Sequence, residues 1–142
     1  MRSVTRLGLL LIALTLGGTR LFAEADVVAI VSAKSAIANL TQSEVADLFL
    51  GRASRLPDGG KALPLDQPEG SAPRDEFYAK FAGKSAAQVK AHWSKIIFTG
   101  RGQPPAEVPN SQEARKRVAE NPNAIAYIER TLVDDSVRIV SQ

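Results

Sequence analysis

The loop Thr99-Gly100-Arg101-Gly102 contains residue types that suit a binding role. Glycines flank an arginine there, so backbone amides and a guanidinium are available to an anion or to a partner protein. The interpretation that the sequence favours is structural: Gly100 ends a helix, and a surface loop follows. Gly100 and Arg101 are therefore candidates for a second, auxiliary contact.

Catalytic chemistry finds little support in the available side chains. His92 is the only histidine and the chain has no cysteine, so neither a nucleophile–base pair nor a metal site has a local set of partners. Four acids lie close together in the sequence: Asp66, Glu69, Asp75 and Glu76. Acids near a helix start usually stabilise its positive end. We predict a protein that is not an enzyme, with no catalytic residue, no metal site and no cofactor.

The N-terminal stretch has the pattern of a secretory signal peptide. Arg2 and Arg6 precede an apolar run over residues 7–16, which is too short to span a bilayer as a stable helix. Small residues at Ala23 and Ala25 then offer a cleavage site after either one. We predict a signal peptide over residues 1–25 and a periplasmic location. The alternative is a membrane anchor that stays attached.

Residues 26–142 are predicted to form one domain. This stretch carries 15 basic and 14 acidic side chains, so the basic balance of the whole chain comes largely from its first 25 residues. Nucleic-acid binding is therefore not predicted. Because the chain has no cysteine, core packing must supply the stability.

Short β-branched runs alternate with capped amphipathic segments in this domain. The predicted strands are 26–32, 62–66, 124–128 and 136–140. Four helices are predicted to begin after cap residues, two of which form capping boxes with a Glu or Gln three residues on. The caps are Thr41 with Glu44, Ser71, Ser85 with Gln88, and Asn110 with Glu113. This order predicts an α/β fold with a mixed sheet covered by helices.

Two of these helices carry side chains that invite a functional interpretation. After Ser85, the apolar stripe comprises Val89, Trp93, Ile96 and Ile97, and Trp93 and Phe98 are predicted to lie in the core. A platform on which a ligand stacks is the alternative for Trp93 and Phe98. The basic run over residues 115–117 is predicted to be a solvated helix face, with an anionic partner as the alternative.

Four segments, taken in order, resemble passages of a known family. The segments are 39–52, with Asn39-Leu40-Thr41 and Leu48-Phe49-Leu50-Gly51-Arg52; 66–77, with Gly70-Ser71; 93–100; and 118–128, with Ala124-Ile125-Ala126-Tyr127-Ile128. In order and spacing they are similar to the phosphate ABC-transporter substrate-binding proteins, in particular to short relatives with little more than one lobe. The resemblance implies a periplasmic-binding-protein-like lobe over residues 26–142. The full family fold has two such lobes, which close on phosphate between them.

The resemblance also implies where an anion binds. In the family, backbone N–H groups and hydroxyls at a helix start hold phosphate. The corresponding positions here are Gly70, Ser71 and Ala72, and Arg74 adds a guanidinium if it turns back toward the helix start.

Three departures from the family pattern weaken this anion site. Pro73 lacks an N–H, Gln67 stands where the family has an arginine, and Glu69 adds a negative charge. An ordinary N-cap at Ser71 with an exposed Arg74 remains the alternative.

These observations lead to one function and two alternatives. We predict a periplasmic substrate-binding-like protein that binds phosphate or a similar small anion weakly, as part of phosphate uptake or sensing. The first alternative is a protein-interaction module without a small-molecule ligand, which docks to an ABC-transporter permease, a porin or a sensor. The second is a homodimer whose two copies rebuild a two-lobed clamp.

Overall fold

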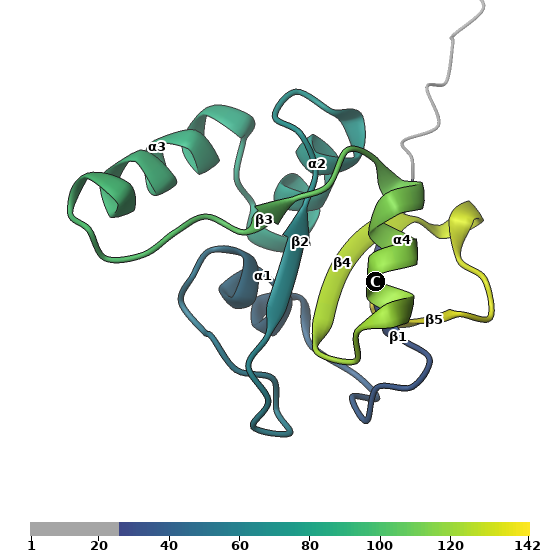
Figure 1. The fold of residues 1–142 in the computed structure, drawn as a ribbon. Helices are drawn as coiled ribbons and strands as arrows, with labels where there is room; N and C mark the ends of the chain where they lie inside the picture. Colours follow the sequence, from purple (N-terminus) through teal and green to yellow (C-terminus); the bar gives the residue numbers. More distant parts are fainter. Residues whose placement is uncertain (1–25) are drawn as a thin grey trace, which may run out of the picture.

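The computed structural model describes residues 26–142, so the predicted signal peptide lies outside the described residues. The described chain forms five strands and four α-helices (Figure 1). In chain order they are β1 Val27–Ser32, α1 Gln42–Phe49, β2 Leu63–Asp66, α2 Ala72–Phe77, α3 Ala86–Phe98, β3 Ala106–Glu107, α4 Ser111–Glu120, β4 Ala124–Glu129 and β5 Val137–Ser141. No helix among these residues is long and apolar enough to cross a bilayer.

The five strands form one mixed sheet in the order β3-β2-β4-β1-β5. β2 pairs in parallel with both β3 and β4, whereas β1 runs antiparallel to both β4 and β5. β1 is buried along its whole length, which explains its continuous run of apolar residues. The predicted α/β fold with a mixed sheet covered by helices is confirmed.

Helices cover both faces of the sheet. Because side chains alternate along a strand, Val27, Ala29 and Val31 of β1 pack with α1 and α2, whereas Val28 and Ile30 pack with α4. On the first face, the rings of Phe77 and Tyr127 stack with centroids 4.1 Å apart.

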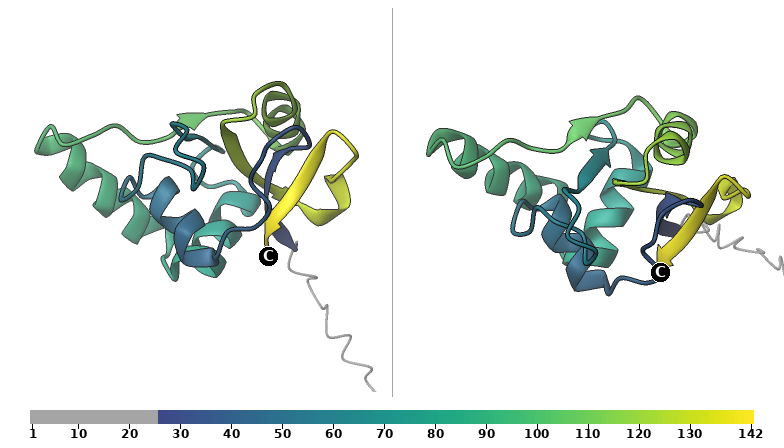
Figure 2. Two further views of the ribbon diagram at one scale, coloured as in Figure 1. Left: turned by 90° about the horizontal axis from the view of Figure 1, so that it is seen from below. Right: turned by 60° about the horizontal axis from the view of Figure 1, so that its bottom comes forward.

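α3 lies apart from the sheet. Figures 1 and 2 show it extending to one side of the molecule, with the loop after it running back to β3. Val89 and Trp93 are its only buried residues. Ile97 is 54% exposed and Phe98 is 93% exposed. The prediction that Phe98 lies in the core is therefore wrong, because the last turn of α3 extends beyond the body that it would pack against.

Three of the four predicted helix caps are confirmed. Both hydrogen bonds of the capping box form at Thr41 and at Ser85, and the Asn110 side chain accepts a hydrogen bond from the amide of Glu113. Ser71 stands at the N-cap position of α2, but its side chain makes no capping hydrogen bond. At Ser71, therefore, the predicted cap has the right position but lacks the expected bond.

The structure adds two features that sequence patterns missed. The helix predicted to begin after Ser71 is α-helical only to Phe77 and continues as a π-helical turn over Tyr78–Ala82, before Gly83 ends it with a positive φ of 61°. The two-residue strand β3 lies within the segment predicted to be a loop. This strand brings the loop after α3 back to the sheet, beside the end of β2.

Candidate binding site

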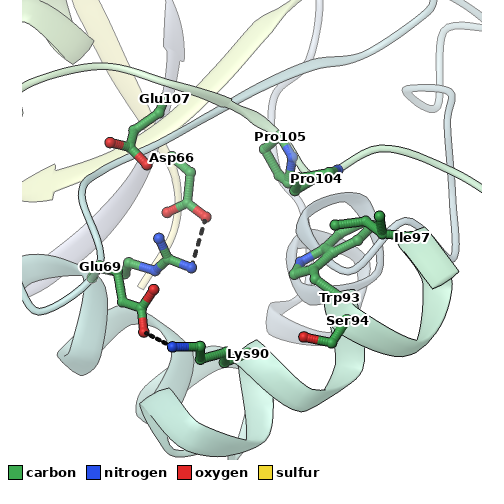
Figure 3. A pocket seen from close by; sticks show the side chains of 10 residues that line it. Asp66, Glu69, Lys90, Trp93, Ser94, Ile97, Pro104, Pro105 and Glu107 are labelled. Carbon is green, nitrogen blue, oxygen red and sulfur yellow. Dashed lines mark ion pairs between the residues drawn. The ribbon is translucent and has the colours of Figure 1, made fainter.

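A pocket of about 230 Å³ opens where the parallel strands β2 and β3 end, beside α2 and α3 (Figure 3). Asp66 and Glu107, the last residues of the two strands, line it together with Glu69. Arg74 and Lys90 supply its cations. Figure 3 shows Trp93, Ser94 and Ile97 of α3 on the side opposite the carboxylates. We refer to this pocket as the Asp66 pocket.

Asp66 is the most connected side chain of the pocket. It is 4% exposed, and its Oδ2 accepts a 2.6 Å hydrogen bond from the hydroxyl of Tyr78. Its Oδ1 accepts hydrogen bonds from the hydroxyl of Tyr127 and from the amide of Gln67, the latter at 2.8 Å. A buried carboxylate is stable only when donors surround it. Asp66 therefore joins the end of β2 to the π-helical turn after α2 and to β4.

The two tyrosines are held in their neutral form. Burial and the adjacent negative charge of Asp66 raise the pKa of Tyr78 and of Tyr127 far above the ordinary value for a phenol. Each phenol donates its proton to Asp66, so ionisation would leave two negative charges in contact. The phenols act as fixed donors to the carboxylate.

Arg74 does turn back from α2, but toward the protein itself. Its Nη1 donates to the carbonyl of Gln67 at 3.1 Å, and its Nη2 lies 4.0 Å from Oδ2 of Asp66. The guanidinium also lies over the ring of Tyr78, 5.6 Å from the centroid. Asp66 therefore offsets most of the charge that Arg74 would present to an anion.

The other predicted anion-binding residues lie beside the pocket and do not line it. Gly70 adopts a positive φ of 86°, which lets the chain turn into α2. The Ser71 amide donates to the carbonyl of Pro68 at 3.0 Å, and its hydroxyl oxygen is buried without a hydrogen-bond partner. Ala72 is exposed. Of the four predicted residues, Arg74 alone faces the pocket.

Gln67, at the position of the family's arginine, has a structural role. It is 2% exposed, and its side-chain amide donates to the hydroxyl of Ser111 at 3.0 Å and to the carbonyl of Tyr127 at 3.1 Å. These bonds join the end of β2 to the start of α4 and to β4. The side-chain N–H groups of Gln67 are therefore bonded inside the protein and do not face a ligand.

The charges around the pocket nearly cancel. Lys90 forms an exposed ion pair with Glu69, with Nζ and Oε1 3.5 Å apart, and Asp66 faces Arg74. Glu107 is the third carboxylate. Three acids against two cations oppose a dianion, whereas polar donors remain on the α3 side. The indole Nε1 of Trp93, for example, is buried without a hydrogen-bond partner.

Arg101 lines a second cavity, of about 460 Å³, and Gly102 rather than Gly100 accompanies it. Gly100 has a positive φ of 67° directly after the C-cap of α3, as the structural interpretation of this loop expects. We refer to the second cavity as the Arg101 cavity. Trp93 lines both cavities.

His92 and two of the three basic residues of α4 have structural partners. The Nε2 of His92 lies 2.8 Å from the carbonyl of Leu50, across to the end of α1. In α4, Arg115 pairs with Asp134 and Arg117 with Glu113. Within residues 26–142, no three side chains of the His, Asp and Glu types are grouped so as to hold a metal ion.

Sequence patterns did not identify Lys90 and Glu107 as pocket residues, and they gave a ligand-stacking role for Trp93 only as an alternative. Glu107 was hidden because its two-residue strand is too short to leave a periodic pattern. Asp66 carried a usable signal, since an acid that ends an apolar strand is well placed to line a site there. Lys90 and Trp93 required knowledge of how α3 lies.

Several solved structures share this fold, and the names of two of the three given below refer to phosphate transport. A protein from Clostridium perfringens, described as a phosphate ABC transporter substrate-binding protein with bound phosphate, is 23% identical with a TM-score of 0.63, over 81% of this chain and 44% of its own. An ABC-type phosphate transport receptor from Vibrio cholerae is 15% identical with a TM-score of 0.64, over 81% and 45%. PstS from Borrelia burgdorferi is 17% identical with a TM-score of 0.56, over 82% and 46%.

These matches define the fold and its extent. No protein-family model matches the sequence, and no curated protein matches it. The chain spans less than half the length of each of the three receptors. With identities of 23% or lower, the likeness is one of fold. The fold expected from the resemblance is thus confirmed: this chain has the fold of one lobe of the phosphate ABC transporter substrate-binding proteins.

Proposed function

We propose that this protein is an exported binding lobe, not an enzyme, that holds phosphate or a similar small anion weakly in phosphate uptake or sensing. The observation that carries the proposal is the position of the Asp66 pocket at the carboxyl ends of β2 and β3, beside the start of α2. In open α/β sheets, ligands bind at this edge. The phosphate-binding receptors with the same fold support the class of ligand.

Weak binding follows from the charges that line the pocket. Lys90 and Arg74 are its cations, and each faces a carboxylate of the same pocket. An incoming anion competes with Glu69 for Lys90 at an exposed site, where water screens the attraction. We expect dissociation constants in the millimolar range, roughly 4 kcal/mol of binding free energy.

Isothermal calorimetry with phosphate, sulfate and small carboxylates tests this proposal. The Glu69→Gln variant removes a repulsive charge beside Lys90, so we expect it to bind phosphate about fivefold more tightly. Lys90→Gln should weaken binding by a similar factor. Lys116→Gln, at an exposed position of α4, serves as the matched control and should change nothing. Absence of binding heat from every anion at millimolar concentration refutes the anion-binding function.

A second function, docking to a transporter permease, a porin or a sensor, is favoured by one observation. Phe98 is 93% exposed at the end of α3, and Ile97 beside it is 54% exposed. Large exposed apolar side chains at a projecting end are typical of protein contacts. Pull-downs from periplasmic extract with wild type and Phe98→Ser test this. A band that both proteins capture equally argues against docking through Phe98.

A phosphate-dependent homodimer is the third arrangement to test. Face-to-face pairing across the Asp66 pocket would bring six carboxylates together around one ligand, because each copy contributes Asp66, Glu69 and Glu107. Like charges across an interface repel each other. We therefore expect sedimentation to show a monomer with and without phosphate. A dimer that forms only with phosphate establishes the two-copy clamp instead.

A further inference from the structure

We propose that the Arg101 cavity is a second ligand site, and that it takes a small organic anion with an apolar body, such as an aromatic carboxylate. The cavity lies between the end of α1, the segment that leads into β2, and the loop after α3. It has about twice the volume of the Asp66 pocket, at about 460 Å³ against 230 Å³. Its ligand class follows from the chemistry of its lining.

The charge of this lining is purely positive. Lys61 and Arg101 are its only charged residues, and neither forms an ion pair with a described residue. Both side chains are exposed, so they lie at the solvent side of the cavity. The contrast with the Asp66 pocket is direct, because there each cation faces a carboxylate. An anion entering the Arg101 cavity therefore displaces no internal partner.

The rest of the lining is largely apolar. Leu48 and Trp93 are buried, and Ile96 is half-buried beside them. The indole reaches this position because residue 51 is a glycine. A Cβ at Gly51 would lie 2.8 Å from Cη2 of Trp93, and Gly51 has a positive φ of 72°. The ring thus packs against the end of α1 and provides an apolar wall.

These two properties together select the ligand. Inorganic phosphate would use the cations but leave the half-buried Ile96 and the exposed edge of Trp93 in contact with water. A neutral apolar molecule would cover that surface but leave Lys61 and Arg101 without a partner. An aromatic carboxylate satisfies both, with its carboxylate at the cations and its ring against Trp93. Ser54 and Gln103, which also line the cavity, supply polar groups for the carboxylate.

Trp93 makes the test direct, because it is the only tryptophan of the chain. Phenylacetate is the probe, with phenylacetamide as its neutral counterpart. We expect phenylacetate to change the fluorescence of Trp93 in a saturable way and phenylacetamide to bind at least about fivefold more weakly, because it cannot use the charge of the two cations. Equal binding of the two compounds, or no saturable change with phenylacetate, overturns the proposal.

Matched variants identify which cavity is occupied. Lys61→Gln and Arg101→Gln should each weaken phenylacetate binding about fivefold, whereas Lys90→Gln, at the Asp66 pocket, should leave it unchanged. All three positions are exposed, so the variants are expected to fold, and an unchanged melting temperature verifies this. If Lys90→Gln alone weakens binding, the probe occupies the Asp66 pocket and the proposed second site is wrong.

This inference is independent of phosphate binding. If phosphate gives no binding heat while phenylacetate changes the fluorescence of Trp93, the proposed function is wrong and the second site stands. The opposite result refutes the second site alone.

Discussion

Asp66 joins three parts of the chain through one carboxylate. Its oxygens accept from the hydroxyls of Tyr78 and Tyr127 and from the backbone of Gln67, and Arg74 balances its charge. In an Asp66→Asn variant, the side-chain amide presents a donor where two phenols already donate, and the guanidinium of Arg74 loses its negatively charged partner. We expect a loss of about 3 kcal/mol in the free energy of unfolding, measured in urea.

Asp135→Asn is the matched control for this loss, since Asp135 is exposed. It should change the free energy of unfolding by less than about 0.5 kcal/mol. An Asp66→Asn variant as stable as this control contradicts the structural role of the network.

The two phenols set an upper pH limit on the stability of the folded protein. Tyr78 and Tyr127 are the only tyrosines, and both have a raised pKa in the folded state. In the unfolded chain they ionise near pH 10, so above that pH the unfolded state binds fewer protons than the folded state. Their contribution to stability is therefore complete below about pH 10 and falls as the pH rises further.

Phenolate absorbance checks this expectation. It should stay low above pH 10 while the protein is folded and rise together with the loss of circular dichroism. A gradual rise before unfolding means that a phenol is accessible. Tyr78→Phe, which removes one of the two titrating groups, should roughly halve the pH dependence.

Sequence reasoning at the residue scale succeeded where the partners are neighbours in the chain. Thr41 with Glu44 lie three residues apart, and so do Ser85 with Gln88, so spacing alone identifies them. Asp66 and Tyr127 are 61 residues apart, and no local pattern joins them. The sequence left open whether Arg74 turns back toward the helix start, and only the fold reveals that its guanidinium lies beside Asp66.

At the scale of elements, α3 is the least firmly attached helix. It buries only Val89 and Trp93, and its start depends on the Ser85 capping box. Elements with few buried contacts open locally before the core unfolds. We therefore expect amide exchange in α3 to be faster than in β1 and β4, whose pairing lies inside the sheet.

Ser85→Ala sharpens this prediction. Loss of the cap should cost the helix about 1 kcal/mol and speed exchange in α3 about fivefold, with β1 unchanged. Ser94→Ala, on the exposed side of the same helix, is the control and should have no such effect. Equal exchange rates in α3 and β1 would show that α3 opens only with the whole domain.

The elements themselves were largely predictable, because most carry strong local signals. The apolar run of β1 and the capped starts of α1, α3 and α4 all correspond to observed elements. β3 was missed because two residues cannot show alternation. The position of α3 was missed for another reason: its apolar stripe is longer than the surface that receives it, so Phe98 is left exposed.

On the scale of the whole molecule, charge is distributed unevenly along the chain. Residues 77–106, which contain α3, carry five lysines and arginines and no acid. The other described residues carry ten such cations against fourteen acids. The net charge is therefore +5 for residues 77–106 and −4 for the other described residues. Net charge alone therefore describes the electrostatics of this protein poorly.

Two Lys→Glu variants distinguish the effect of where a charge lies from the effect of the total charge. Lys95→Glu lies within the basic segment and Lys116→Glu lies outside it, yet both change the net charge equally. Both lysines are exposed. We expect Lys95→Glu to elute clearly earlier from a cation exchanger than Lys116→Glu. Identical elution of the two variants would show that the basic segment does not act as a patch.

Because α3 projects from the body of the protein, the uneven distribution of charge affects the rate at which the protein meets a charged partner. A protein whose positive charge lies on a projecting helix is turned by a negatively charged surface as the two approach, so the helix tends to face that surface at the collision. Phe98, the last residue of α3 and 93% exposed, would then be among the first side chains to touch that surface. The speed of recognition would then depend steeply on ionic strength, even if the final complex is held together mainly by the aromatic ring.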